Sequence, residues 1–462
     1  AMASKNEQRA VQYFNAALDL DPTFLKAFES IESMLSATSN WQALEENYIA
    51  MLKRIPDTRA GIKEVLWKNL GDLYRFRLRS LEGATQAYRV VVRMKPDTAE
   101  NVEVLADLLA RSPQTSDEAA AAYQRLLTLA PQKAGRALHE LLRIALAKKA
   151  FDRAFVYAQA LKVRGEAQPS ELEVMQLYTK QLPGQPKRAM TDKLWDNLLL
   201  HPAAKSPLAA ISAVLWRSAG SVLAYQPKDY GLDKKRATDW ERVDLDAPVQ
   251  SYFVNQLKLV RGVLAVGGFE LYAKANSAEP LSPLCLEQPT LAMGKASPLL
   301  GETNRARLWF TIGRQLCALR PVFVLPRTLG AQRFNTLIDV AVRFVDPRYP
   351  VRGDPAEIAR FEAALTRLGA PLQNALRPHV AELLKLKQAV NTKPFLEGME
   401  HTAVRTGYVL TGDIELCAML AKMPDPAAIP IRPEDKIGEL LRFAVSDESF
   451  ELRSRLGTAI GS

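Results

Sequence analysis

The sequence predicts a mainly α-helical protein in which an array of paired helices is followed by an α-rich domain with a small β-sheet. Prolines 22, 56, 96 and 131 are spaced by 34, 40 and 35 residues, and each ends an apolar run with helical periodicity. Proline is more frequent in the rest of the chain, since residues 1–180 contain only 6 of the 28 prolines. Strand-like alternation is confined to short segments between 269 and 293. We therefore expect an array over 1–186, capping helices and a linker over 187–246, and an α-rich domain over 247–462.

Within the array, small and aromatic residues recur before each proline, where they allow two helices to pack closely. These residues are Ala10, Phe14 and Ala17; Leu44, Tyr48 and Met51; Ala84, Tyr88 and Val91; and Ala119, Tyr123 and Leu126. A fifth unit without a closing proline has Leu138, Leu141, Leu142 and Ala145, then Ala154, Ala158 and Leu161. The periodicity predicts that the chain opens with a helix over 7–20.

Residues 67–74 read Trp-Lys-Asn-Leu-Gly-Asp-Leu-Tyr, which matches the pattern W-x2-L-G-x2-Y without a mismatch. With Ala84, Tyr88 and Pro96 at the expected spacing, this unit resembles a tetratricopeptide repeat (TPR), and the resemblance covers about residues 5–165. It implies a helical superhelix. The opening helix corresponds to the second helix of a repeat, so we expect further repeats before it in the native protein.

The TPR resemblance also implies that the first helix of each unit lines a concave surface. Side chains beside the packing positions on that face would form a groove for a helix or an extended peptide of a partner protein. The candidates for this groove are Lys26, Glu29, Lys68, Asp72, Arg75, Glu103, Asp107, His139 and Arg143. Their mixed charges would set specificity, although each could equally be a solvated helix side chain.

In the second half, the sequence predicts helices over 189–200 and 206–223, and a mixed loop over 226–246. A helix over 247–266 is expected to precede strands over 269–274, 284–286 and 290–293. Further helices are expected over 304–319, 329–345, 354–388, 394–423 and 434–459.

This order of helix, strands and apolar helix resembles the catalytic core of HtpX-like zincin metallopeptidases over about residues 247–423. In that family, an HExxH helix supplies two zinc-binding histidines and a general base, and a later E-x-x-A-D-R segment supplies a third ligand. Here Arg314 and Ala318 occupy the histidine positions, and Gln315 occupies that of the base. The later segment, 400–405, reads Glu-His-Thr-Ala-Val-Arg, with Val404 in place of aspartate.

These departures exclude the zincin chemistry, because arginine does not ligate zinc and alanine has no ligand atom. The resemblance then implies a degenerate, non-catalytic domain without a metal or other cofactor. A carboxylate left at such a site must be paired if it is buried. We therefore expect a vestigial pair in which Arg314 binds Glu400, so that Arg314→Ala or Glu400→Ala lowers the melting temperature.

Composition constrains the remaining function classes. The net charge of +10 is diffuse, and its densest patch, Lys234-Lys235-Arg236, is flanked by Asp233 and Asp239, which favours solvated surface over nucleic-acid binding. The three cysteines, Cys285, Cys317 and Cys417, form no CxxC pair and fit a reducing, cytoplasmic location. No apolar segment is long enough to predict a transmembrane helix.

The sequence thus predicts a scaffold or adaptor that binds a protein partner through the array, through the C-terminal domain, or through both. Residues 406–413 and 443–450 resemble C-terminal regions of large repeat proteins from myxobacteria, which implies a bacterial complex-assembly role. Two alternatives stay open: a metal-dependent peptidase with unusual ligands, and a nucleic-acid-binding protein that uses the basic surface of the second half.

Overall fold

The computed structural model describes residues 2–232, 239–247, 251–386, 390–423 and 429–461. The basic patch at 234–236 lies outside the described residues. The chain divides into two compact units, residues 1–149 and residues 150–462. Helices dominate both units and a small sheet lies in the second, which confirms the predicted mainly α class. No helix in the described part of the chain has the length and apolar character needed to cross a bilayer.

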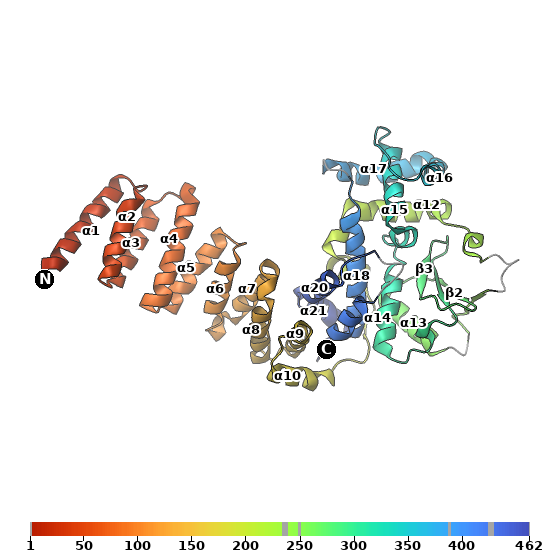
Figure 1. Cartoon of the computed structure of the whole chain (residues 1–462), viewed down its shortest axis with the longest axis horizontal. Coiled ribbons are helices and arrows are strands. Elements are labelled where there is room, and N and C mark those ends of the chain that lie inside the picture. Colours follow the sequence, from red (N-terminus) through yellow and green to blue (C-terminus); the bar gives the residue numbers. More distant parts are fainter. Residues whose placement is uncertain (1, 233–238, 248–250, 387–389, 424–428, 462) are drawn as a thin grey trace. The chain divides into compact units, whose positions relative to one another are not determined.

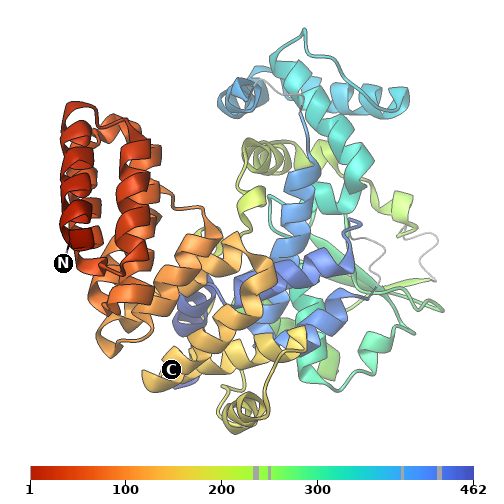
Figure 2. The same cartoon turned by 60° about the vertical axis from the view of Figure 1, so that its left-hand side comes forward.

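Unit 1 consists of helices that follow one another as antiparallel hairpins, each beside the next (Figures 1 and 2). They are α1 (Met2–Leu20), α2 (Leu25–Ala37), α3 (Trp41–Arg54), α4 (Ala60–Leu73), α5 (Leu81–Met94), α6 (Ala99–Leu109), α7 (Ser116–Leu129) and α8 (Ala134–Ala147). Each proline of the spaced series follows a helix, as a residue without a backbone N–H should.

Close packing between α4 and α5 explains the glycine of the W-x2-L-G-x2-Y segment. A Cβ on Gly71 would lie 2.8 Å from the ring of Tyr88, so only glycine leaves room for that ring. Ala84 and Tyr88 are buried, as are Tyr48 and Tyr123 in the neighbouring hairpins. The small and aromatic positions read from the sequence therefore form the interior of unit 1.

The division between the units falls inside the range 1–186 that we expected for the array. It separates α8 from α9 (Phe151–Arg164), the two helices of the expected fifth pair. Within unit 2, the Asp152 carboxylate on α9 accepts bonds of 3.0 and 2.5 Å from Arg453. Gln159 bonds the backbone at Gly412 and Ile414. These contacts across more than 250 residues give α9 partners that local periodicity does not reveal.

The helices of unit 2 follow the predicted order with additional breaks. After α9 and α10 (Pro169–Thr179) come α11 (Asp192–Leu194), α12 (Pro207–Leu223), α13 (Tyr252–Leu264), α14 (Arg305–Cys317), α15 (Val324–Val345), α16 (Pro355–Thr366), α17 (Gly369–Lys385), α18 (Lys393–Thr411), α19 (Ile414–Ala421), α20 (Pro433–Ala444) and α21 (Asp447–Leu456). The helix expected over 189–200 is reduced to α11 and a π-helical turn.

Three expected long helices are each divided in two. Gly412, with a φ of +67°, separates α18 from α19, and Gly369, with a φ of +58°, is the first residue of α17, directly after the break that follows α16. Left-handed backbone ends an α-helix, and glycine adopts it without a Cβ clash. The third break is at Ser446, whose hydroxyl accepts a bond from Ser449 N and caps α21.

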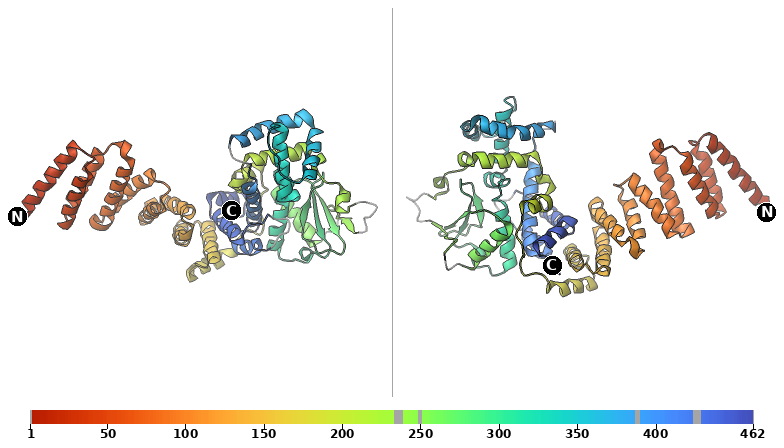
Figure 3. Two further views of the ribbon diagram at one scale, coloured as in Figure 1. Left: turned by 45° about the horizontal axis from the view of Figure 1, so that its top comes forward. Right: turned by 180° about the vertical axis from the view of Figure 1, so that it is seen from behind.

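The sheet has the order β1-β2-β4-β3, where β1 is Trp240–Arg242, β2 is Glu270–Lys274, β3 is Ser282–Leu284 and β4 is Thr290–Gly294 (Figure 3). Strands β2 and β4 pair in parallel with Leu271 opposite Leu291, and the outer strands pair antiparallel. Strand β1 lies in the expected loop 226–246, so that expectation was wrong there. Its three residues are too few for a periodic signal, and they become a strand by pairing with β2.

Helices α14 and α18 cross closely beside this sheet, and the crossing positions the buried charges described below. A Cβ on Gly313 of α14 would clash with Leu410, and a Cβ on Gly407 of α18 would clash with Phe310. Glycine at both positions brings the two backbones together. Arg314 follows directly after one of these glycines, and Glu400 lies on the same face of α18 two turns before the other.

Candidate functional site

The candidate groove residues of unit 1 differ in whether they form ion pairs with other side chains of the protein. Lys26 and Glu29 on α2 and Lys68 on α4 are exposed. Among the described residues, these three side chains make no ion pair. They are therefore available to a partner without the loss of an internal contact.

Asp72 and Arg75 form an ion pair with 3.0 Å between Arg75 Nη1 and Asp72 Oδ1. The hydroxyl of Tyr88 donates a 2.7 Å hydrogen bond to the same carboxylate oxygen. Burial is the main cause that raises the pKa of Tyr88 to about 12, and the bond to Asp72 adds to it. Asp72 thus joins α4 to α5, and its first role is structural.

Glu103 and Asp107 on α6 are also internally engaged. Glu103 accepts from Lys133 at 2.5 Å and from Arg136 at 2.7 Å, and Asp107 lies 2.6 Å from Arg136 Nη2. On α8, Arg143 pairs with Glu140 at 2.8 Å, and His139 is half-buried. This end of the expected groove is an ion-pair network, because partners on α8 and the turn before it neutralise the acids of α6.

One regular feature of unit 1 is absent from the sequence predictions. The buried tyrosines Tyr48, Tyr88 and Tyr123 each donate to a carboxylate 16 residues earlier, which is Glu32, Asp72 or Asp107. The distances are 2.5, 2.7 and 2.8 Å. The repeated acid-to-tyrosine spacing was the signal that could have revealed these bonds, which satisfy hydroxyls on a buried ring.

A hollow of about 380 Å³ lies where α4 meets α5 and α6 ends. We call it the arginine hollow; it is lined by Tyr74, Arg75, Phe76, Arg79, Ser80, Leu81, Ala84, Leu108 and Arg111. Of the nine predicted groove residues, only Arg75 lines it. Arg79, Ser80 and Arg111 were missed because they lie in connections between helices, which carry no helical periodicity.

In unit 2, Arg314 Nη2 lies 3.2 Å from Glu400 Oε2, as the expected pair requires. A second arginine, absent from the prediction, makes the shorter contact: Arg327 Nη1 is 2.7 Å from Glu400 Oε1. Arg327 also donates to Gln315 Oε1 at 3.2 Å, and Ile429 N donates to Glu400 at 3.2 Å. Glu400 is 1% exposed and accepts from all three donors.

This buried cluster has the properties of a structural tie. Its carboxylate is held by donors from three segments of the chain, and all its charged groups are at least nine-tenths buried. The donors occupy both oxygens of Glu400, so a reacting group would have to displace an arginine first. We therefore interpret the cluster as a structural contact between α14, α15 and α18 rather than as a reactive site.

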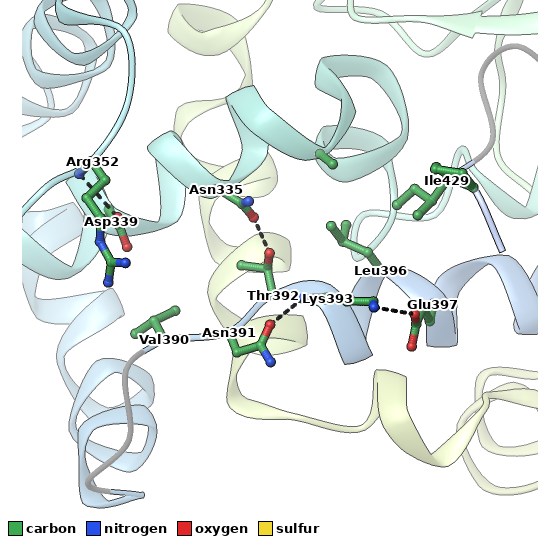
Figure 4. Close-up of a pocket in the computed structure, with 12 residues that line it drawn as sticks. Asn335, Asp339, Arg352, Val390, Asn391, Thr392, Lys393, Leu396, Glu397 and Ile429 are labelled. Atoms are coloured by element: carbon green, nitrogen blue, oxygen red, sulfur yellow. Dashed lines mark hydrogen bonds and ion pairs between the residues drawn. The ribbon is translucent and has the colours of Figure 1, made fainter.

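A cavity of about 540 Å³ lies next to this cluster, and its lining includes Leu396 and Ile429, whose backbone N–H donates to Glu400 (Figure 4). Thr392 donates to Asn335, and Asn391 Oδ1 accepts from the backbone N–H of Lys393 at 3.1 Å. At the far side, Asp339 accepts from the backbone N–H of Arg352 at 3.3 Å. Burial raises the pKa of Asp339, so this carboxyl is a weaker acid than usual. These polar side chains are internally bonded, and Val390, Leu396, Ile429 and Pro430 give the cavity an apolar part.

A histidine pair lies beside another hollow of about 250 Å³. The rings of His201 and His401 are 5.0 Å apart, and His201 Nε2 lies 3.4 Å from Glu439. His201 Nδ1 accepts from Ala203 N at 3.1 Å, so both nitrogens of this ring are engaged. Such a histidine holds its tautomer fixed but has no nitrogen left to take a substrate proton.

Burial opposes ionisation of Glu439, but the bonds from His201 and Arg405 outweigh it and hold the pKa of Glu439 far below its usual range. Burial lowers the pKa of His401 to about 4. This cluster therefore contains an ionised acid and a neutral histidine near neutral pH. The described residues include no group of three or more His, Cys, Asp or Glu side chains that could hold a metal ion.

No protein-family model matches the chain, and no curated protein matches it.

Proposed function

We propose that this chain is a scaffold or adaptor whose unit 1 is a TPR-type array that binds a protein partner. The observation that carries the proposal is the exposure of Lys26, Glu29 and Lys68, whose charges make no ion pair within the described structure. The acids Glu103 and Asp107 on the expected face are, by contrast, internally neutralised. Among the predicted groove residues, the charges without an ion pair therefore lie on α2 and α4, where they would select a partner of complementary charge.

For unit 2, we propose a non-catalytic, zincin-derived domain that serves as a scaffold. Support comes from Arg314, which occupies the position of a family ligand and carries a permanent positive charge. Its pairing with Glu400, together with Arg327, gives a former ligand position a structural role. A cytoplasmic location belongs to the same proposal and is supported by three buried cysteines that form no disulfide.

The test uses the full chain as bait in a lysate of its native host, with retained proteins identified by mass spectrometry. The variant Lys26→Glu/Lys68→Glu reverses two groove charges. The control Lys53→Glu/Arg59→Glu makes the same charge change at two exposed residues of unit 1 outside the predicted groove.

We expect one discrete protein to be retained by the wild type and the control, and to be reduced at least about tenfold by the groove variant. Equal retention by the groove variant would overturn the groove proposal. Elemental analysis of the same preparation tests the peptidase alternative, which requires about one zinc per chain. Salt-sensitive retention on heparin would instead favour nucleic-acid binding.

A further inference from the structure

The arginine hollow is built by an unusual end to α4. The helix passes into a π-helical turn, Tyr74–Leu78, and Arg79 then adopts a left-handed φ of +52° before α5 begins. A π-turn places successive side chains differently from an α-turn, and such turns are frequent at functional sites. Here it directs Arg75, Phe76 and Arg79 to one hollow.

Internal contacts hold this turn in place. A Cβ on Gly83 would lie only 2.7 Å from the Tyr74 ring, so glycine leaves room for this ring. The Tyr74 hydroxyl donates a 2.6 Å hydrogen bond to Glu45. Ser80 caps α5 by accepting from Gly83 N at 3.1 Å. The hollow is therefore preformed, so a ligand would not have to order it.

The charge of the hollow is of one sign. Three of its nine lining residues are arginines and none is an aspartate or a glutamate. Arg75 already bonds Asp72 at 3.0 Å. Arg79 and Arg111 are exposed, and within the described residues they make no ion pair. Two guanidinium groups are thus free to bind carboxylates, which they match geometrically.

Apolar surface lies beside these arginines. The Phe76 ring is 63% exposed and Leu81 is 38% exposed. The guanidinium of Arg75 lies 4.6 Å from the centroid of the Phe76 ring. Aromatic residues and arginine are enriched in the cores of protein interfaces.

We propose that the arginine hollow binds an acidic peptide segment of a partner protein, with an apolar side chain beside its carboxylates. Arg79 and Arg111 bind the carboxylates, and Phe76 with Leu81 contacts the apolar side chain. This inference rests on the proposed function and specifies the class of partner that unit 1 binds. The eight predicted groove residues other than Arg75 do not line the hollow.

The experiment measures fluorescence anisotropy of a fluorescein-labelled peptide of Glu, Asp, Phe and Leu residues mixed with the full chain. The comparison probe replaces every acid by its amide, so that only the charge changes. The test variants are Arg79→Gln/Arg111→Gln and Phe76→Ala. The control Arg59→Gln/Arg93→Gln removes two exposed arginines of unit 1 away from the hollow.

We expect the acidic peptide to bind at least about tenfold more tightly than the amide peptide. The Arg79→Gln/Arg111→Gln variant should abolish this preference, and Phe76→Ala should weaken binding severalfold at an unchanged preference. The control should bind like the wild type. Circular dichroism melting confirms that each variant is folded.

Equal affinity for the two peptides, or full binding by the double variant, would overturn the inference. Binding of inorganic phosphate through the same arginines without binding of the acidic peptide would also overturn it in favour of a phosphate site. If the acidic peptide does not bind while the lysate partner is still retained through Lys26 and Lys68, this inference fails and the groove proposal stands. If the peptide binds through the arginines and no lysate partner is retained, the inference holds and the groove proposal fails.

Discussion

Arg327 lies 2.7 Å from Glu400, closer than the predicted partner Arg314 at 3.2 Å, so the buried carboxylate is shared by two arginines. Replacing Glu400 by leucine should lower the free energy of unfolding by about 3–5 kcal/mol, because two buried guanidinium groups lose their counter-charge. Urea denaturation followed by circular dichroism measures this loss. Arg327→Met should cost more than Arg314→Met.

The control for this prediction is the triple variant Arg314→Met/Arg327→Met/Glu400→Leu, which removes all three charges together. It should be more stable than Glu400→Leu alone, since no unpaired charge is left in the interior. A single Glu400→Leu variant as stable as the wild type would contradict the buried ionic tie.

Gly71 and Gly61 lie on the same helix and provide a matched pair. Gly71→Ala should destabilise unit 1 by about 1–3 kcal/mol, because the new methyl group would meet the Tyr88 ring at 2.8 Å. Gly61→Ala has no atom within 4 Å of the new Cβ and should stabilise by up to about 1 kcal/mol. Thermal melting of both variants tests the opposite signs, and a stabilised Gly71→Ala would refute the close contact.

Ala265 ends α13 in a left-handed conformation with φ +51°. A residue with a Cβ is strained there, so Ala265→Gly should raise the free energy of unfolding by roughly 1 kcal/mol. Ala16→Gly, at an exposed position inside α1, should lower it by about 0.5–1 kcal/mol. Denaturation midpoints that move in the same direction for both variants would contradict this assignment.

The pKa of His401, lowered by burial to about 4, makes stability depend on pH. The unfolded histidine takes up a proton near pH 6.5, whereas the folded one stays neutral until about pH 4. Its contribution is therefore present above pH 6.5 and is lost as pH falls towards 4, on the order of 3 kcal/mol in total. The charged neighbours are Glu439, Arg405 and Arg442, and the His201 ring lies 5.0 Å away in a tilted orientation.

His401→Gln should remove most of this decline between pH 6.5 and 4, whereas the control His379→Gln should keep it. Urea denaturation at intervals across this range provides the measurement. The carboxyl groups are present in every variant, so the difference between the curves of the wild type and His401→Gln reports on His401. Parallel curves for wild type and His401→Gln would rule out His401 as the source.

The predicted helix pairs of unit 1 agree with the structure because their signals are local. Proline after a helix, a glycine under a tyrosine ring and small residues at a close crossing all act within about one hairpin. The same holds for β2 and β4, whose alternation or apolar run is contained in five residues each. Assignment of the array to the TPR family stays a prediction.

The candidate sites were only partly predictable. The Arg314–Glu400 pair was inferred from two weakened motifs, but Arg327 lies 73 residues before Glu400 and belongs to no motif. The ion pairs that neutralise Glu103 and Asp107 come from residues about 30 positions away. The arginine hollow escaped prediction because a π-turn and a left-handed arginine leave no periodic trace.

The sequence by itself determined the helical class, the hairpin spacing of unit 1 and the positions of β2 and β4, since these depend on backbone preference and on periodic burial along short stretches. The tertiary structure alone decided that α9 joins unit 2, that Trp240–Arg242 becomes a strand, and which charges stay free. The physical reason is that pairing of buried charges and edge strands depends on groups brought together across long chain separations, where local preference has no influence.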